Sequence, residues 1–102
     1  MVAVIEDRRQ EVAELCLRHC VNRLELFGSA AEGQFDPASS DLDFLVEFLP
    51  LSPARHADAY FGLLEALQDL FGRDVDLVEV RAVHNPYVLD SINRSRTVIY
   101  AA

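Results

Sequence analysis

The hydrophobic and polar positions divide the first half of the chain into one helical segment and two strand-like segments. From Ala3 to Cys20 the apolar residues recur at the period of an amphipathic helix. In the segment Asn22–Gly28, Leu24 and Leu26 alternate with charged residues, which predicts a strand with one covered face. The segment Asp41–Phe48 also alternates and is predicted to be a second strand.

A second helix is predicted after the second strand, between residues 52 and 72. Ser52 is a suitable N-terminal cap, Pro53 suits the first helical position, and Gly72 suits the position just past the end. The apolar residues between them follow the helical period and are expected to face the core: Ala57, Tyr60, Phe61, Leu64, Leu67 and Phe71.

The remaining chain is predicted to form a strand over Asp74–Val80, a short helix from Asn85 to about Ser95, and a closing strand at "TVIYA". Tyr87 and Tyr100 are expected in the core. The resulting order, α-β-β-α-β-α-β, indicates an α+β fold in which a four-stranded mixed sheet has helices packed on one side. Residues 1–102 are expected to form a single domain.

The charge balance restricts the surfaces that the protein can bind. Nine arginines and no lysine face seventeen carboxylates, so the net charge is -8. Such a charge disfavours broad contact with nucleic acid or an anionic membrane. The chain contains no apolar run of the length that spans a bilayer, and its first ten residues lack the pattern of a secretory signal. A cytoplasmic location is expected, with neither a membrane nor a nucleic acid as direct partner.

One cluster in the first helix has residue types that can bind a soft metal. Cys16, His19 and Cys20 lie on one helical face, but a closed zinc site needs a fourth ligand, and none is evident nearby. Reduced cysteines that pack in the helix, with a histidine at the surface, are the favoured interpretation.

Three aspartates suggest a site for a hard divalent cation. Asp41 and Asp43 are two positions apart on a predicted strand, so their side chains project to the same face. Two like charges at that distance repel each other unless a cation lies between them, and oxygen ligands suit Mg²⁺ or Mn²⁺. Asp76 would join the pair if the second and third strands are neighbours. The three carboxylates are therefore expected to converge on one metal-binding patch.

The loop before these aspartates has features of a phosphate-binding turn. Gly28 allows the backbone to approach a phosphate closely, and Ser29 adds a hydroxyl and backbone amides that can accept its negative charge. Because Mg²⁺ completes its shell with substrate phosphates, the combination points to a nucleoside triphosphate as co-ligand.

The three sequence stretches "GSAAEG", "SDLDFLV" and "DVDLV" together resemble the minimal nucleotidyltransferases of the DNA polymerase β superfamily, from about Asn22 to the end of the chain. The resemblance implies a polymerase β palm-like fold. It also implies that Gly28 and Ser29 grip the triphosphate, that Asp41 and Asp43 bind metal, and that Asp76 completes the metal site or acts as a base.

The resemblance implies an activity and a partner as well. The family transfers a nucleoside monophosphate, here expected to be AMP from ATP, to a hydroxyl and releases pyrophosphate. Many stand-alone members resemble antitoxins that are paired with a HEPN-type ribonuclease toxin and that silence it by adenylylating a tyrosine. A hetero-oligomer with such a toxin is therefore expected.

One position departs from the family pattern. Glu32 occupies the place where the turn usually carries an arginine, and a glutamate repels the phosphates that an arginine would bind. Arg55, Arg73 or Arg81 could compensate, although a solvated surface is the favoured role for these arginines. Two hypotheses follow: an active Mg²⁺-dependent nucleotidyltransferase, which is preferred, or an antitoxin of the same fold that acts by binding alone.

Overall fold

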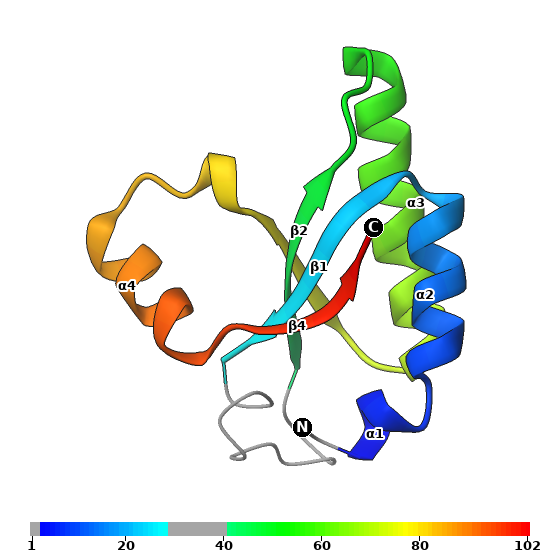
Figure 1. Cartoon of the computed structure of the whole chain (residues 1–102), viewed down its shortest axis with the longest axis horizontal. Coiled ribbons are helices and arrows are strands. Elements are labelled where there is room, and N and C mark those ends of the chain that lie inside the picture. The colour runs from blue at the N-terminus through cyan, green and yellow to red at the C-terminus, as the bar shows by residue number, and fades with distance from the viewer. Residues whose placement is uncertain (1–2, 29–40) are drawn as a thin grey trace.

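The computed structural model describes residues 3–28 and 41–102, and these residues form a four-stranded sheet with helices on both faces (Figure 1). The order of helices and strands is the predicted one. The elements are α1 (Ala3–Glu6), α2 (Arg9–Arg18), β1 (Val21–Phe27), β2 (Leu42–Phe48), α3 (Pro53–Phe71), β3 (Val75–Glu79), the 3-10 turn η1 (Val80–Ala82), α4 (Pro86–Ser95) and β4 (Thr97–Ala101).

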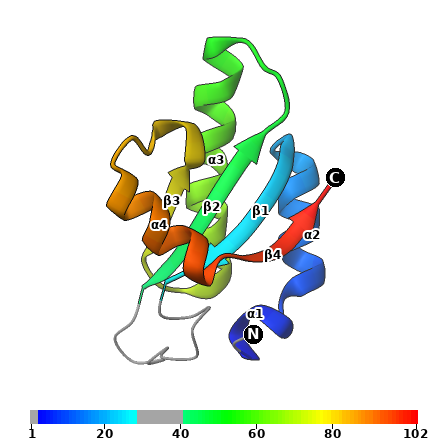
Figure 2. The same cartoon turned by 60° about the vertical axis from the view of Figure 1, so that its left-hand side comes forward.

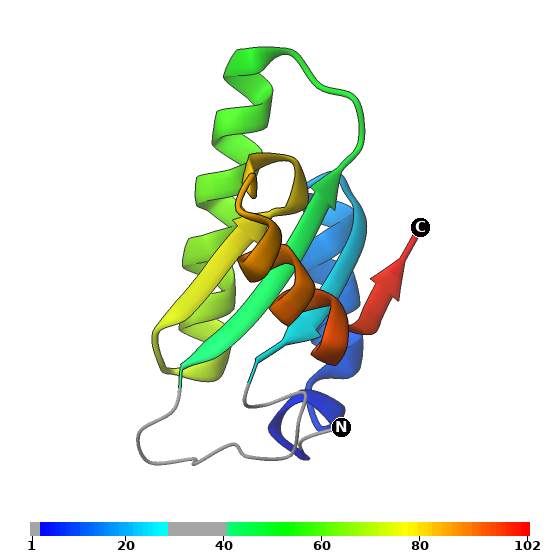
Figure 3. The same cartoon turned by 90° about the vertical axis from the view of Figure 1, so that its left-hand side faces the viewer.

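The sheet is mixed, as predicted, and its strand order is β3-β2-β1-β4. β1 pairs antiparallel with both β2 and β4, whereas β2 and β3 are parallel. A parallel pair needs a long crossover connection, and α3 supplies it. As a result, β1 ends at the edge of the sheet where β2 and β3 begin (Figure 3).

The main hydrophobic core lies between one face of the sheet and the helices α2 and α3. The inward residues of β2 alternate along the strand as predicted and are buried there: Leu42, Phe44, Val46 and Phe48. From the helices, Val12, Cys16, Leu63 and Leu67 are fully buried against them. This layer corresponds to the predicted arrangement of helices on one side of the sheet.

The helix α4 differs from that expectation because it crosses the opposite face of the sheet (Figure 2). Leu45 of β2 and Ile92 of α4 are buried, yet neither belongs to the main core cluster. The second face of the sheet is thus covered as well. The prediction failed here because α4 is short and has only a narrow apolar stripe, which did not indicate the face that it would cover.

The caps of α3 are those predicted, but its buried face is rotated. The Ser52 hydroxyl accepts a hydrogen bond from the Arg55 amide at 3.4 Å, and Gly72 ends the helix in the left-handed conformation with φ 64°. The buried residues are spaced four apart: Ala59, Leu63, Leu67 and Phe71. Phe61, which was predicted to face the core, is 65% exposed and packs edge-on against Tyr60.

Two other sequence predictions need correction. The first helix is interrupted: α1 ends at Glu6 and α2 begins at Arg9. The bend still leaves Ile5 fully buried beside α2. Tyr87 is 85% exposed at the start of α4, where Asn85 caps the helix, whereas Tyr100 packs partly buried against the core as predicted.

The helices of the described ranges, 3–28 and 41–102, include none that is both long and apolar enough to cross a membrane.

Candidate functional site

Three strand ends meet at one edge of the sheet and bring the predicted site residues together. Gly28 follows the last residue of β1, and that residue, Phe27, is the register partner of Asp43. Asp43 in turn is the register partner of Asp76 on the parallel strand β3. Because register partners project to the same face, both carboxylates lie on the face that carries α4.

The Asp43 and Asp76 carboxyl groups are close enough to interact directly. The pKa of Asp43 is raised to about 6, first by burial, then by its hydrogen bond to Asp76 and by the charges of Asp76 and Asp41. Two ionised carboxylates this close repel each other, so the pair is unfavourable when both groups are charged. This arrangement is one that a divalent cation would relieve.

Asp41 lies outside this close pair. It immediately precedes β2, is exposed, and makes the smallest of the contributions that raise the Asp43 pKa. Within residues 3–28 and 41–102, no three side chains of His, Cys, Asp or Glu are grouped closely enough to hold a metal ion. Of the three carboxylates expected to converge, the structure pairs two.

The backbone of Gly28 lies directly against the Asp43 carboxylate. Its φ is +75°, a conformation that favours glycine, and a Cβ at this position would collide with Oδ2 of Asp43. The Gly28 amide donates a hydrogen bond to the Ser95 hydroxyl at 3.0 Å. The absence of a side chain at Gly28 therefore makes room for the Asp43 carboxylate. Ser29 and Glu32 themselves lie outside the described residues.

A cavity of about 420 Å³ opens beside the acidic pair. Asp43 and Asp76 form its charged wall, while Phe27 and two residues of α4, Val88 and Ile92, supply apolar surface. The combination of two carboxylates with an apolar wall suits a ligand that has both a metal-binding anionic part and a less polar part.

The three arginines that could offset Glu32 do not line this cavity. Among the described residues its lining contains no arginine. Arg55 instead lines a hollow between α2 and α3, and Arg81 lines one beside the end of β2.

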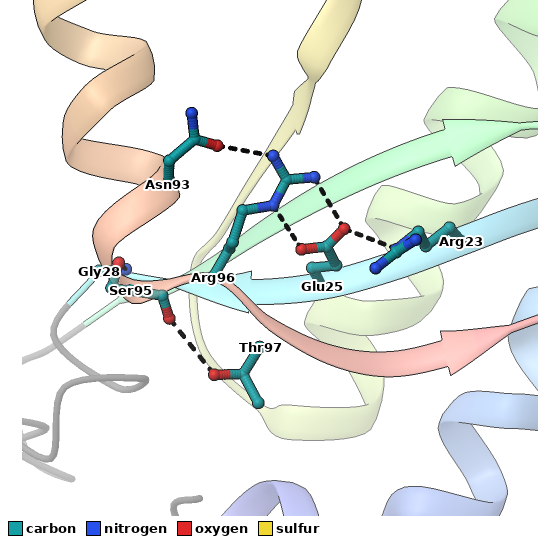
Figure 4. A network of polar contacts seen from close by, with 7 residues as sticks. All are labelled: Arg23, Glu25, Gly28, Asn93, Ser95, Arg96 and Thr97. Atoms are coloured by element: carbon teal, nitrogen blue, oxygen red, sulfur yellow. Dashed lines mark hydrogen bonds and ion pairs between the residues drawn. The ribbon is translucent and has the colours of Figure 1, made fainter.

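The site contains supporting residues that were not predicted. Glu25 was expected on the polar face of its strand, but its side chain is only 3% exposed. Arg96, directly after α4, donates two hydrogen bonds to Glu25, at 2.6 and 2.8 Å, and Arg23 lies 2.8 Å from the same carboxylate (Figure 4). No local sequence signal identifies this pair, because its members are 71 positions apart.

The electrostatics of Glu25 follow from these contacts. The hydrogen bonds from Arg96 lower the pKa of the Glu25 carboxyl, and burial opposes that effect. The same hydrogen bonds raise the pKa of Arg96. The pair ties the end of α4 to β1, and Ser95, one residue before Arg96, ties it to Gly28 (Figure 4).

Cys16 packs in α2 as favoured, whereas Cys20 lies past the end of α2 with a φ of 60°. Both cysteines are free, and burial raises the pKa of the Cys16 thiol to about 12, so it stays protonated. The His19 ring packs against Gly62 of α3, and no metal-binding group forms around it in the described ranges.

Residues 5–99 match the sequence profile of the nucleotidyltransferase domain. The chain belongs to this nucleotidyltransferase family. Two proteins of Methanocaldococcus jannaschii, both named as candidate protein adenylyltransferases, are 37% identical over 75 residues, or 74% of this chain, and the matches cover 73% and 72% of those proteins. The expected nucleotidyltransferase family is confirmed.

Solved structures confirm the fold. A candidate minimal nucleotidyltransferase, 33% identical, superposes with a TM-score of 0.66 over 91% of this chain and 90% of its own. A toxin-antitoxin complex with AMP-PNP gives a TM-score of 0.67 at 21% identity, covering 92% of this chain and 73% of that one. An MNT antitoxin in complex with the tri-AMPylated HEPN toxin of Shewanella oneidensis gives 0.64 at 18% identity, covering 95% and 72%.

Proposed function

We propose that this nucleotidyltransferase is a Mg²⁺-dependent adenylyltransferase that transfers AMP from ATP to a tyrosine hydroxyl of a HEPN-type toxin and thereby acts as an antitoxin in the cytoplasm. The observation that carries the proposal is the pairing of Asp43 with Asp76 beside Gly28, at the mouth of a cavity. The family match and the relatives named as adenylyltransferases support the reaction type.

The acidic pair has the chemistry to hold the cation. Asp43 and Asp76 supply hard oxygen ligands, and Asp41 is near enough to influence the charge of Asp43. Mg²⁺ bound there supplies positive charge for the triphosphate and the leaving group. The raised pKa of Asp43 fits such a site, because a bound cation would relieve the repulsion between the two carboxylates.

The other groups position the reactants. Ser29, next to Gly28 in the sequence, would offer its hydroxyl and its amide to the phosphates. The acceptor oxygen attacks the α-phosphorus, the bond from phosphorus to the bridging oxygen of the β-phosphate breaks, and pyrophosphate leaves. Asp76 is exposed and lines the cavity, and in this proposal it either completes the metal site or accepts the hydroxyl proton.

The HEPN-type partner rests on the structural neighbours, several of which are toxin-antitoxin complexes. A small helical protein encoded next to this one is the first partner to test. The chain would be co-purified with that protein and incubated with ATP and Mg²⁺. Mass spectrometry is expected to show tyrosines that have gained an adenylyl group.

The alternative, neutralisation by binding alone, is favoured by Glu32 in the phosphate-binding turn. The same experiment separates the two functions. A stable complex that suppresses the ribonuclease activity of the partner without any adenylyl group would establish the binding function. The Asp43→Asn variant is the matched control, since it should still bind the partner but should transfer nothing.

A further inference from the structure

Ser95 is the last residue of α4 and is distant in sequence from the predicted site, yet it contacts the site directly. Its hydroxyl accepts the hydrogen bond of the Gly28 amide at 3.0 Å. The residue is 8% exposed, so this bond is largely shielded from water. The Gly28 amide is the first one after β1, and the ladder between β1 and β2 ends one residue earlier, at Phe27 and Asp43.

Ser95 is itself held in place from both sides. Arg96, the next residue, is bound by the buried Glu25 of β1, and Asn93 accepts a further hydrogen bond from Arg96 at 2.7 Å. The Ser95 carbonyl accepts a hydrogen bond from the Thr97 hydroxyl at 3.3 Å. These contacts leave the Ser95 hydroxyl in a fixed position relative to β1.

The position of Gly28 matters because its backbone lies against the Asp43 carboxylate. A Cβ on Gly28 would collide with Oδ2 of Asp43, and the φ of Gly28 is +75°. A hydrogen bond that fixes Gly28 therefore fixes the end of β1 relative to the acidic pair.

We infer that Ser95 is a positioning residue of the nucleotide site, which acts by holding Gly28 in its left-handed conformation against Asp43. The inference deepens the proposed function, and its nucleotide part rests on that function. Ser95 is not among the described residues that line the cavity, and its hydroxyl is bound to Gly28. Its effect passes through Gly28 and is expected on binding of the triphosphate more than on the chemical step.

The test combines amide exchange with nucleotide binding. In the wild-type protein, NMR hydrogen exchange should show a protected Gly28 amide. Ser95→Ala should accelerate exchange of this amide about tenfold, which corresponds to the free energy of one lost hydrogen bond. Ser95→Ala should also weaken binding of ATP with Mg²⁺ about tenfold and raise KM for ATP while kcat changes little. Ser95→Thr, which keeps the hydroxyl, should restore both properties.

Ser52→Ala is the matched control, because it removes the same type of bond, from a backbone amide to a seryl hydroxyl, at the start of α3. It should leave Gly28 exchange and ATP binding unchanged. Unchanged Gly28 exchange in Ser95→Ala, or accelerated exchange with unchanged ATP binding, would overturn the inference.

Two further outcomes are also decisive. If Ser95→Ala does not fold, the wild-type measurement decides, because rapid exchange of the Gly28 amide in the folded protein contradicts the inference. If the wild-type protein binds no ATP, the proposed function fails. Loss of Gly28 protection in Ser95→Ala would then still support the role of Ser95 in holding Gly28.

Discussion

Two carboxylates on the same face of the sheet have opposite surroundings. Glu25 of β1 is buried between the guanidinium groups of Arg96 and Arg23, which favour its charged form. Asp43 of β2 is half-buried beside Asp76, and its pKa is raised to about 6. Both acids lie near the end of α4 and away from the main core.

The difference separates an acid that stabilises the fold from an acid placed for a ligand. A buried carboxylate with a bidentate arginine is satisfied within the protein. A half-buried carboxylate that lies beside another acid is not satisfied within the protein, and this is the reason for proposing that a cation binds there. Near α4, the fold tolerates an unfavourable acidic pair at the edge of the cavity, and a satisfied ion pair anchors the adjoining strand and helix.

The largest effect is expected from removing the unsatisfied acids. Asp43→Asn and Asp76→Asn should each lower adenylyl transfer at least about 100-fold, because the site loses a metal ligand. Asp41→Asn should also lower transfer, but less, since Asp41 is exposed and interacts least with Asp43. Circular dichroism should show that all three variants fold. Unfolding of Asp43→Asn would assign this residue a structural role instead.

Removing the satisfied acid should affect stability rather than chemistry. Glu25→Ala leaves Arg96 without its buried partner and should lower the free energy of unfolding by about 2–3 kcal/mol. Urea denaturation measures this change. A decrease of less than about 0.5 kcal/mol in the free energy of unfolding would show that the pair of Glu25 and Arg96 does not anchor α4. The contrast between Glu25 and Asp43 would then not hold.

The two acids should give opposite responses to pH. The folded pKa of Asp43 lies above its unfolded value of 3.8, so repulsion lowers stability above pH 6 and is relieved as the pH falls from 6 to 3.8. Asp43→Asn should therefore be about 1 kcal/mol more stable than wild type at pH 8, allowing for partial solvent screening, and should lose this advantage towards pH 4.

For Glu25 the sign is reversed. Its folded pKa is depressed, so its contribution is present above the unfolded value of 4.5 and is lost as the pH falls through the folded pKa. Thermal unfolding of both variants from pH 3 to pH 8 measures the two profiles. A constant difference between Asp43→Asn and wild type across this range would contradict the repulsion assigned to the acidic pair.

The smallest effect is expected at Glu79, which lies on β3 three residues after Asp76. Its carboxylate contacts the His56 ring at 2.6 Å, and both side chains are partly exposed, at 28% and 40%. Glu79→Gln should change stability by less than about 1 kcal/mol and leave ATP binding intact. Glu79→Gln and Asp76→Asn each remove one negative charge from β3. If both variants lost ATP binding equally, closeness to Asp43 would not explain the role of Asp76.

The sequence was sufficient to predict the order of elements, the caps of α3 and the start of α4, and, on the condition that β2 and β3 are neighbours, the approach of Asp76 to Asp43. Those features depend on local periodicity, on capping residues, and on the two-residue repeat of strands. The face covered by α4, the burial of Glu25 and the contact between Ser95 and Gly28 could not be predicted. Each depends on packing between segments that are distant in the sequence, and the Ser95 and Glu25 contacts join residues more than sixty positions apart.

The proposed function requires that the acidic pair of Asp43 and Asp76 binds a divalent cation together with a triphosphate. Calorimetric titration of ATP into the wild-type protein, with and without Mg²⁺, tests it most directly, with Asp43→Asn and Glu79→Gln as controls. We expect ATP to bind only in the presence of Mg²⁺. This binding should be lost in Asp43→Asn and kept in Glu79→Gln. Binding that is independent of Mg²⁺ or that survives in Asp43→Asn would contradict the proposed function.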